Sequence, residues 1–167
     1  MAKVTPFLWF DKQAEEAINF YTSIFKNSKI ISITRYPEDV PEGPMKGMEG
    51  LVLTGIFELD GQRFMALDGG PQFKFNESVS FSIDCDSQAE VDYYWDKLSA
   101  VPEAEQCGWL KDKYGLSWQV IPHQLNDLMS DPDPAKSKRI TAAMLKMKKI
   151  VIADLQAARD SDKESKD

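Results

Sequence analysis

Three serines alternate with apolar residues in the segment that runs from Ser78 to Ile83. A period of two is typical of a β-strand, so Ser78, Ser80 and Ser82 should present their hydroxyl groups on one face of a sheet. Hydroxyl groups both donate and accept hydrogen bonds. The pattern therefore predicts either the polar wall of a binding site or a strand with one face in solvent.

A glutamine and a tryptophan further along the chain could belong to the same site. Gln119 lies in a predicted strand over 116–121, and its amide, if buried, needs partners for one oxygen and two N–H groups. Trp109 lies in a predicted strand over 105–111, where it could stack on a ligand beside a concave surface. The alternatives are a surface glutamine and a core tryptophan.

The chain has one histidine, His123, and two cysteines, Cys85 and Cys107. One histidine excludes H-E-x-x-H and every zinc site that needs two histidines. The sequence places no activating partner beside Cys107 or His123, which favours a small buried thiol and an exposed histidine. Two cysteines form no disulfide framework, and this favours a reducing compartment.

Composition and charge restrict the class of protein. The 167 residues are 43% hydrophobic and 28% charged, with a formal net charge of −7, which indicates one compact globular domain. No run approaches about 18 apolar residues, and the first residues lack a signal core, so we expect a cytoplasmic protein without a membrane span. An acidic chain argues against nucleic-acid binding. Neither G-x-G-x-x-G, a Walker loop nor G-x-S-x-G occurs.

The elements that must position these residues form two similar halves. The first half contains a helix that begins at Asp11 as N-cap, and strands over 4–10, 29–36, 51–59 and 63–68. The second half contains a helix that begins with a capping box at Ser87, and strands over 78–84, 105–111 and 116–121. Asp60 and Gly61 predict a type I′ hairpin turn.

An internal repeat supports this division. Residues 11–15 and 86–90 match at four of five positions, 75 residues apart, and each opens a helix after a strand. The order βαβββ therefore occurs twice, with a shorter second copy. Residues 37–50 are rich in proline and glycine and predict a long loop, of the kind that often forms a lid or a binding loop.

The C-terminal segment has a different character. Residues 135–159 carry a charge of +6, and an apolar stripe at helical spacing predicts one long amphipathic helix over about 134–158. The stripe consists of Ile140, Met144, Met147, Val151, Leu155 and Ala158. It must be buried on its own domain or on a second chain. The polar residues 161–167 predict a frayed tail.

Several segments resemble the PhnB-like branch of the vicinal-oxygen-chelate superfamily, which includes glyoxalase I, bleomycin-resistance proteins and extradiol dioxygenases. This branch is often labelled 3-demethylubiquinone-9 3-methyltransferase. The resemblance runs from Val4 to Ala158, and its motifs are Phe10-Asp11-x-x-Ala14-Glu15-Glu16-Ala17-x-Asn19-Phe20-Tyr21, Leu59-Asp60-Gly61-Gln62-x-Phe64, Asp68-Gly69-Gly70-Pro71 with Phe75-Asn76, Gln106-Cys107-Gly108-Trp109-Leu110-Lys111-Asp112, and Gly115-x-Ser117-Trp118-Gln119.

The resemblance implies a fold, here a single α+β domain over residues 1–160. Two tandem βαβββ modules, about 4–70 and 76–123, would form a curved mixed sheet around a cup, with a C-terminal helix over about 134–158. Superfamily relatives commonly pair, so we also expect a homodimer.

The same resemblance implies that the metal of the superfamily has been lost. Metal-binding members place His, Glu or Gln on the first and last strand of each module. Motif matching puts Ala66 and Ser78 at two of these positions, Thr5 at a third and Gln119 at the fourth, a set that is too weak for a divalent ion. We therefore expect no metal and no cofactor. The glycine-rich turn of a typical methyltransferase is also absent from the sequence.

Alternation along the strands predicts which residues line the cup, with the loop 37–50 at its mouth. These residues are Phe7, Trp9, Phe64, Ser80, Ser82, Trp109 and Gln119. Pro6 could shift the first strand and turn Leu8 and Phe10 inward instead.

We expect a metal-independent protein that binds a small organic ligand, and neither nucleic acid nor a membrane. The alternative is an enzyme on an unidentified small organic substrate, with a metal recruited through Gln119 and either Asp68 or Asp84.

Overall fold

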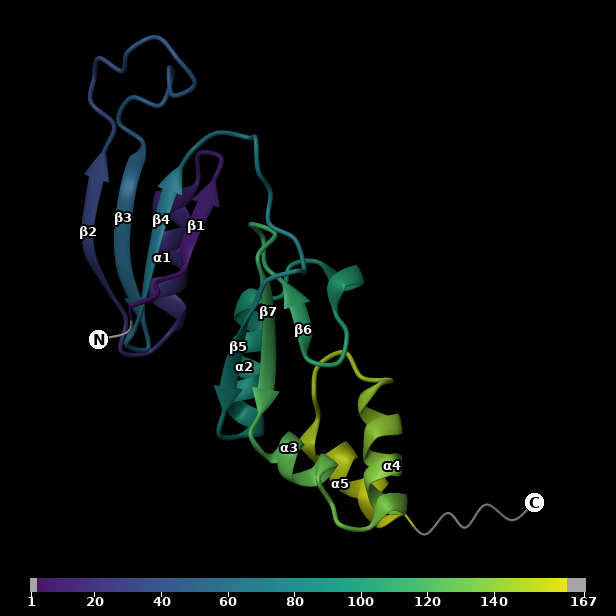
Figure 1. Ribbon diagram of the computed structural model, residues 1–167. Coiled ribbons are helices and arrows are strands. Elements are labelled where there is room, and N and C mark those ends of the chain that lie inside the picture. Colours follow the sequence, from purple (N-terminus) through teal and green to yellow (C-terminus); the bar gives the residue numbers. More distant parts are fainter. Residues whose placement is uncertain (1–2, 162–167) are drawn as a thin grey trace. The chain divides into compact units, whose positions relative to one another are not determined.

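The computed structural model describes residues 3–161, in two compact units, Met1–Lys74 and Phe75–Asp167. Each unit combines one mixed β-sheet with helices, so the α+β class is confirmed (Figure 1). The single domain over 1–160 and the enclosed cup stay predictions, and each unit is described below by itself. Within residues 3–161, no helix is long and apolar enough to cross a membrane.

The first unit is a four-stranded sheet covered on one face by a helix. In chain order its elements are β1 (Phe7–Phe10), α1 (Ala14–Ile24), β2 (Lys29–Arg35), β3 (Val52–Leu59) and β4 (Gln62–Asp68). The strand order is β1-β4-β3-β2, with β1 and β4 parallel and the other pairs antiparallel. The buried side of α1, which includes Ala17, Ile18 and Tyr21, packs against this sheet.

The second unit has a smaller sheet. Its elements are β5 (Ser80–Cys85), α2 (Gln88–Leu98), a 3₁₀ helix (Pro102–Ala104), β6 (Trp109–Lys111) and β7 (Ser117–Pro122), with strand order β5-β7-β6. The three strands predicted for the second half are all present, and the order of this shorter copy is βαββ, one strand fewer than the predicted βαβββ. The predicted strand 105–111 keeps three residues, because Cys107 (φ 49°) and Gly108 (φ 85°) adopt left-handed conformations that a strand does not contain.

Local sequence signals determined one turn and one helix cap. Asp60 and Gly61 both have positive φ, 47° and 79°, as the predicted type I′ turn requires. The side chain of Ser87 accepts a hydrogen bond from the N–H of Glu90, so the predicted N-cap of α2 is confirmed. Asp11 is not the N-cap of α1, because that helix begins later, at Ala14.

The prediction of one C-terminal helix over 134–158 is wrong. The chain forms α3 (Gln124–Met129), α4 (Pro134–Met144) and α5 (Ile152–Asp160). Between α4 and α5 the backbone pairs with another part of the second unit: the N–H groups of Cys107 and Gly108 donate to the carbonyls of Met147 and Lys148, at 2.9 and 2.8 Å. Carbonyls engaged in this way are not available to a continuous helix, which explains the break.

The side chain of Gln88 fixes the same break from the other side. Its amide nitrogen donates to the carbonyl of Ile150 at 3.0 Å, and its amide oxygen accepts from the N–H of Ile152 at 2.9 Å. Two ion pairs assist, Lys149 with Asp92 and Lys148 with Glu105.

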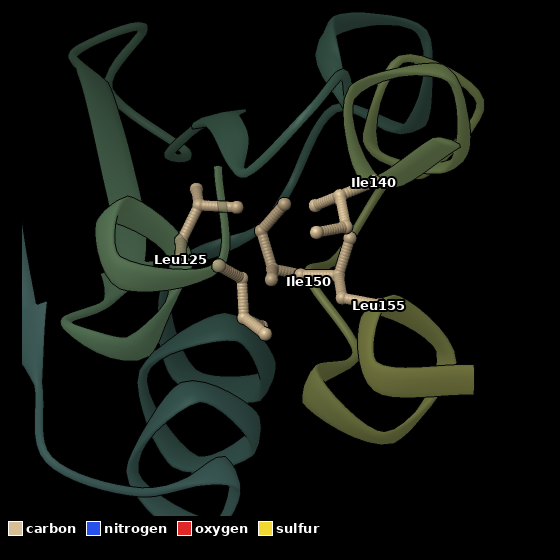
Figure 2. Packing of buried hydrophobic residues seen from close by; sticks show 5 residues of the cluster. Leu125, Ile140, Ile150 and Leu155 are labelled. Atoms are coloured by element: carbon tan, nitrogen blue, oxygen red, sulfur yellow. The ribbon is translucent and has the colours of Figure 1, made fainter. Parts of the chain in front are cut away.

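The apolar stripe is buried within its own unit. Figure 2 shows Leu125, Ile140, Ile150 and Leu155 pointing toward one another from different segments of the second unit. Met144 and Met147 pack against this cluster. Ile140 and Leu155 of the stripe are therefore buried within their own unit, whereas Val151 and Ala158 stay partly exposed.

We expect Ile150→Ala to lower the free energy of unfolding by about 2–5 kcal/mol, because Ile150 is fully buried in this cluster. Leu145→Ala is the matched control, since Leu145 lies in the same segment but is 57% exposed. Urea unfolding of both variants measures the difference. Equal losses in the two variants would contradict the packing described.

Candidate functional site

The predicted polar residues lie on the face of the second sheet that turns away from α2. Trp118 and Val120 of β7 are buried on the side where α2 packs. Their neighbours in β7 therefore lie on the opposite face, which we call the polar face. Two rows of three residues cross its strands: Ser82–Gln119–Trp109 and Ser80–Ser117–Lys111.

Hydrogen bonds link some of these side chains and leave one without a partner. The amide nitrogen of Gln119 donates to the hydroxyl of Ser80 at 3.0 Å. The hydroxyl of Ser117 is buried and has no hydrogen-bond partner within the part of the chain that the structure describes. Ser82 is exposed, whereas Trp109 and Gln119 are half-buried. The structure thus brings four predicted site residues, Ser80, Ser82, Trp109 and Gln119, onto one face.

The first sheet has a corresponding face that is mostly apolar. Phe7 and Trp9 lie beside Met65 and Leu67 in the parallel pairing of β1 and β4, on the side away from α1. Leu8 and Phe10 are buried on the α1 side, so the predicted shift of register caused by Pro6 is not seen. We call Phe7, Trp9, Met65 and Leu67 the apolar face.

Phe64 does not belong to this apolar face. It is 5% exposed and stacks on Phe57 at 5.6 Å between ring centroids, on the side that α1 covers. Because Phe7 pairs with Met65, the preceding residue, Phe64, points to the opposite face of the sheet from Phe7 and Trp9. The prediction that Phe64 shares their face is therefore wrong.

Two glycines hold Trp9 in place. The indole N–H of Trp9 donates to the carbonyl of Gly70 at 3.0 Å, and its ring meets Phe73 edge-on at 5.0 Å. A Cβ atom on Gly69 would lie 2.2 Å from the Trp9 ring, so the ring requires a glycine there. The two glycines of the Asp68-Gly69-Gly70-Pro71 motif therefore contact the Trp9 ring and hold it in place. We call Gly69 and Gly70 the seat of Trp9.

Asp68 connects this seat to the rest of the first unit. Its two carboxylate oxygens accept hydrogen bonds from the N–H groups of Ala14 and Val52, both at 2.9 Å. Burial raises the pKa of Asp68 above its ordinary value, against the effect of these two hydrogen bonds. Both oxygens are occupied, so Asp68 has a structural role and is a poor candidate for recruiting a metal.

The loop 37–50 also packs near Gly70. Val40 and Met48 are buried, and the ammonium group of Lys46 donates to the carbonyl of Val40 at 3.2 Å. A Cβ atom on Gly70 would lie 3.2 Å from the methyl carbon of Met48. The loop is thus attached beside the seat of Trp9, and its place at the mouth of a cup stays a prediction.

Comparison with known proteins identifies the family. Residues 2–121 match the family model described as 3-demethylubiquinone-9 3-methyltransferase. The chain belongs to this family and is PhnB-like. The PhnB protein from Bacillus cereus is 41% identical over 72% of this chain and 99% of its own, with a TM-score of 0.60.

A protein from Pseudomonas aeruginosa shares the fold at 19% identity, over 73% of this chain and 98% of its own, with a TM-score of 0.57. No curated protein matches the chain.

Two of the four residues that motif matching places at metal positions, Ala66 and Ser78, are poor metal ligands in this PhnB-like chain. Over residues 3–161, no group of three or more His, Cys, Asp or Glu side chains is arranged to hold a metal ion. Ala66 is buried and pairs with Leu8, on the α1 side rather than the apolar face. The hydroxyl of Ser78 is hydrogen-bonded to Asn76 before β5 begins. Ala66 thus provides no ligand atom, and the hydroxyl of Ser78 is already engaged.

The two thiols and the histidine of the PhnB-like chain each have a defined environment in the second unit. Burial raises the pKa of Cys85 to about 12, which keeps its thiol protonated at neutral pH. The thiol of Cys107 lies 3.4 Å from the carbonyl of Met144. His123 is exposed, with its Nδ1 atom 3.7 Å from a carboxylate oxygen of Asp86.

Sequence reasoning missed three residues of the two faces: Met65, Leu67 and Lys111. The available signal was the parallel pairing of the first and last strand in each unit. That pairing fixes which residues of the last strand share a face with those of the first.

We expect Asp68→Asn to lower the free energy of unfolding by about 1–3 kcal/mol, because the amide leaves one of the two buried N–H groups without an acceptor. Asp84→Asn, on an exposed residue, is the control. Urea unfolding measures both variants.

Comparison of the wild type with Asp68→Asn also tests the pKa of Asp68. A raised pKa means that the folded protein keeps a proton that the unfolded chain loses near its ordinary value of 3.8. The contribution of Asp68 to stability therefore falls as the pH rises from that value through the folded pKa. The gap between wild type and Asp68→Asn should narrow over this range, and a widening gap would contradict the raised pKa.

Proposed function

We propose that this PhnB-like protein binds a small organic molecule without a metal ion. The polar cluster on the second sheet carries the proposal, since Ser80, Ser117 and Gln119 lie together beside the half-buried Trp109. Buried or half-buried polar side chains gathered on one sheet face are typical of a surface that orients a ligand by hydrogen bonds.

The apolar face of the first unit supports the same function. Trp9 is fixed by Gly69 and Gly70, and Phe7 is 48% exposed. Rigid aromatic side chains provide contact area at a low cost in conformational entropy. A flat apolar group fits the chemistry of this face.

The family description names a methyltransferase, but we do not propose methyl transfer. The sequence lacks the glycine-rich turn of such enzymes, and burial keeps the thiol of Cys85 protonated at neutral pH. The polar face favours binding over the alternative of an enzyme. Cytoplasmic location is part of the proposal, supported by two cysteines that are both free.

Ligand retention tests this function. We expect native mass spectrometry of the purified protein to detect a bound organic molecule, and the bound mass to survive treatment with EDTA. Displacement of that molecule should change tryptophan fluorescence, and the change should be lost in Trp109→Phe. Trp95→Phe is the control, because Trp95 lies in α2, away from the polar face.

Two results would contradict the proposal. One is a bound mass that disappears on chelation. The other is a fluorescence response that is unchanged in Trp109→Phe and lost in the control.

We also propose a homodimer that pairs through the edge strand β2. This strand has one sheet neighbour, β3, and its Ile30 and Ile31 are 39% and 42% exposed. An apolar strand edge of this kind favours pairing with another chain.

Sedimentation equilibrium should give twice the mass of one 18.9 kDa chain. Ile31→Lys should weaken the association, whereas Val79→Lys, at another exposed apolar residue, should not. A single-chain mass at every concentration would overturn this proposal.

A further inference from the structure

Lys111 is the one cationic residue in the two rows of the polar face, and another part of the second unit neutralises it. Its ammonium group contacts the carboxylate of Glu77, which lies in the segment that precedes β5. The Lys111 side chain is 23% exposed and that of Glu77 is 62% exposed. The cation is thus partly enclosed, while its partner stands largely in solvent.

Ser117 lies directly beside Lys111 in the sheet. It pairs with Lys111 of β6 on one side and with Ser80 of β5 on the other. Its hydroxyl is buried and has no hydrogen-bond partner among residues 3–161. The hydroxyl of Ser80 accepts a hydrogen bond from Gln119, which leaves its own proton available to donate.

The row Ser80–Ser117–Lys111 therefore has donors in excess. The two hydroxyl groups and the ammonium group of this row lie on one face, and the acceptor that Lys111 contacts is the carboxylate of Glu77. Buried polar groups in native proteins are rarely left unpaired, so an unpaired hydroxyl beside a cation indicates a missing acceptor. A carboxylate is an acceptor without donors, and it forms its strongest hydrogen bonds with charged groups.

We propose that the row Ser80–Ser117–Lys111 binds a carboxylate group of the ligand, and that Glu77 occupies Lys111 until this carboxylate displaces it. The inference rests on the proposed function and specifies its ligand class, a small organic carboxylate. Glu77 acts as an internal competitor, and its pKa is lowered mainly by the hydrogen bond to Lys111.

Asp84 provides a matched control for charge. It is exposed on the same strand as Ser80 and pairs with Ile121. Four residues along a strand separate Asp84 from Ser80, which is about 13 Å. Removing the charge of Asp84 changes the net charge as much as removing that of Glu77, but it leaves Lys111 untouched.

The experiment uses benzoate and its neutral analogue benzamide as probes, with the full chain titrated by calorimetry. We expect benzoate to bind more tightly than benzamide. E77Q should tighten benzoate binding by about 2- to 5-fold, the range that a partly exposed ion pair contributes. It should leave benzamide unchanged, and D84N should change neither probe.

Ser117→Ala gives a second, independent readout. Removing an unpartnered hydroxyl should not lower the midpoint of urea unfolding, whereas it should weaken benzoate binding. A purely structural serine would show the reverse. The variant therefore remains informative even if E77Q disturbs the segment that precedes β5.

The outcomes separate this inference from the proposed function. Equal binding of benzoate and benzamide, or equal effects of E77Q and D84N, would overturn the carboxylate site while leaving a small-molecule binder. Binding of neither probe would overturn the carboxylate site as well. The proposed function then depends on whether mass spectrometry detects a retained ligand.

Discussion

The carboxylate of Asp68 is the interaction on which the first unit depends. Its oxygens join the start of α1 to the start of β3, and its backbone carbonyl accepts the hydroxyl proton of Tyr36 at 2.9 Å. Three segments far apart in the sequence therefore meet at the end of β4. The next two residues, Gly69 and Gly70, seat Trp9. Burying a carboxylate costs free energy, and the hydrogen bonds of Asp68 offset part of that cost. The same bonds fix the end of β4, next to the glycines that hold Trp9.

The second unit uses a buried aspartate in a different place. Asp112 follows β6 and accepts hydrogen bonds from the N–H groups of Tyr114 and Leu116, and from the indole N–H of Trp118 at 2.9 Å. These bonds fix the turn between β6 and β7, and with it the register that places Trp109 beside Gln119. Each unit thus holds its candidate surface through one buried carboxylate near the end of a strand.

The sequence alone predicted what depends on neighbouring residues. The Asp60-Gly61 turn, the cap at Ser87 and the face shared by Trp109 and Gln119 follow from local conformational preferences and strand alternation. The position of Phe64 did not. Alternation tells which residues of a strand share a face, but pairing with another strand decides which face of the sheet that is. The break between α4 and α5 was also hidden, since its cause is backbone pairing with Cys107 and Gly108, far away in the sequence.

That pairing connects the C-terminal addition to the candidate site. The family model ends at residue 121, and the chain continues through α3, α4 and α5. In the first unit a full strand, β2, completes the sheet, whereas in the second the segment before β6 has no comparable strand. The N–H of Gly108 instead donates to Lys148, and its carbonyl accepts from Val120.

A Cβ atom on Gly108 would lie 2.8 Å from Ile121 and 3.2 Å from Ile150. Gly108 is thus enclosed between β7 and the addition, one residue before Trp109. Residues outside the family region therefore fix the start of β6, and through it the aromatic member of the polar face.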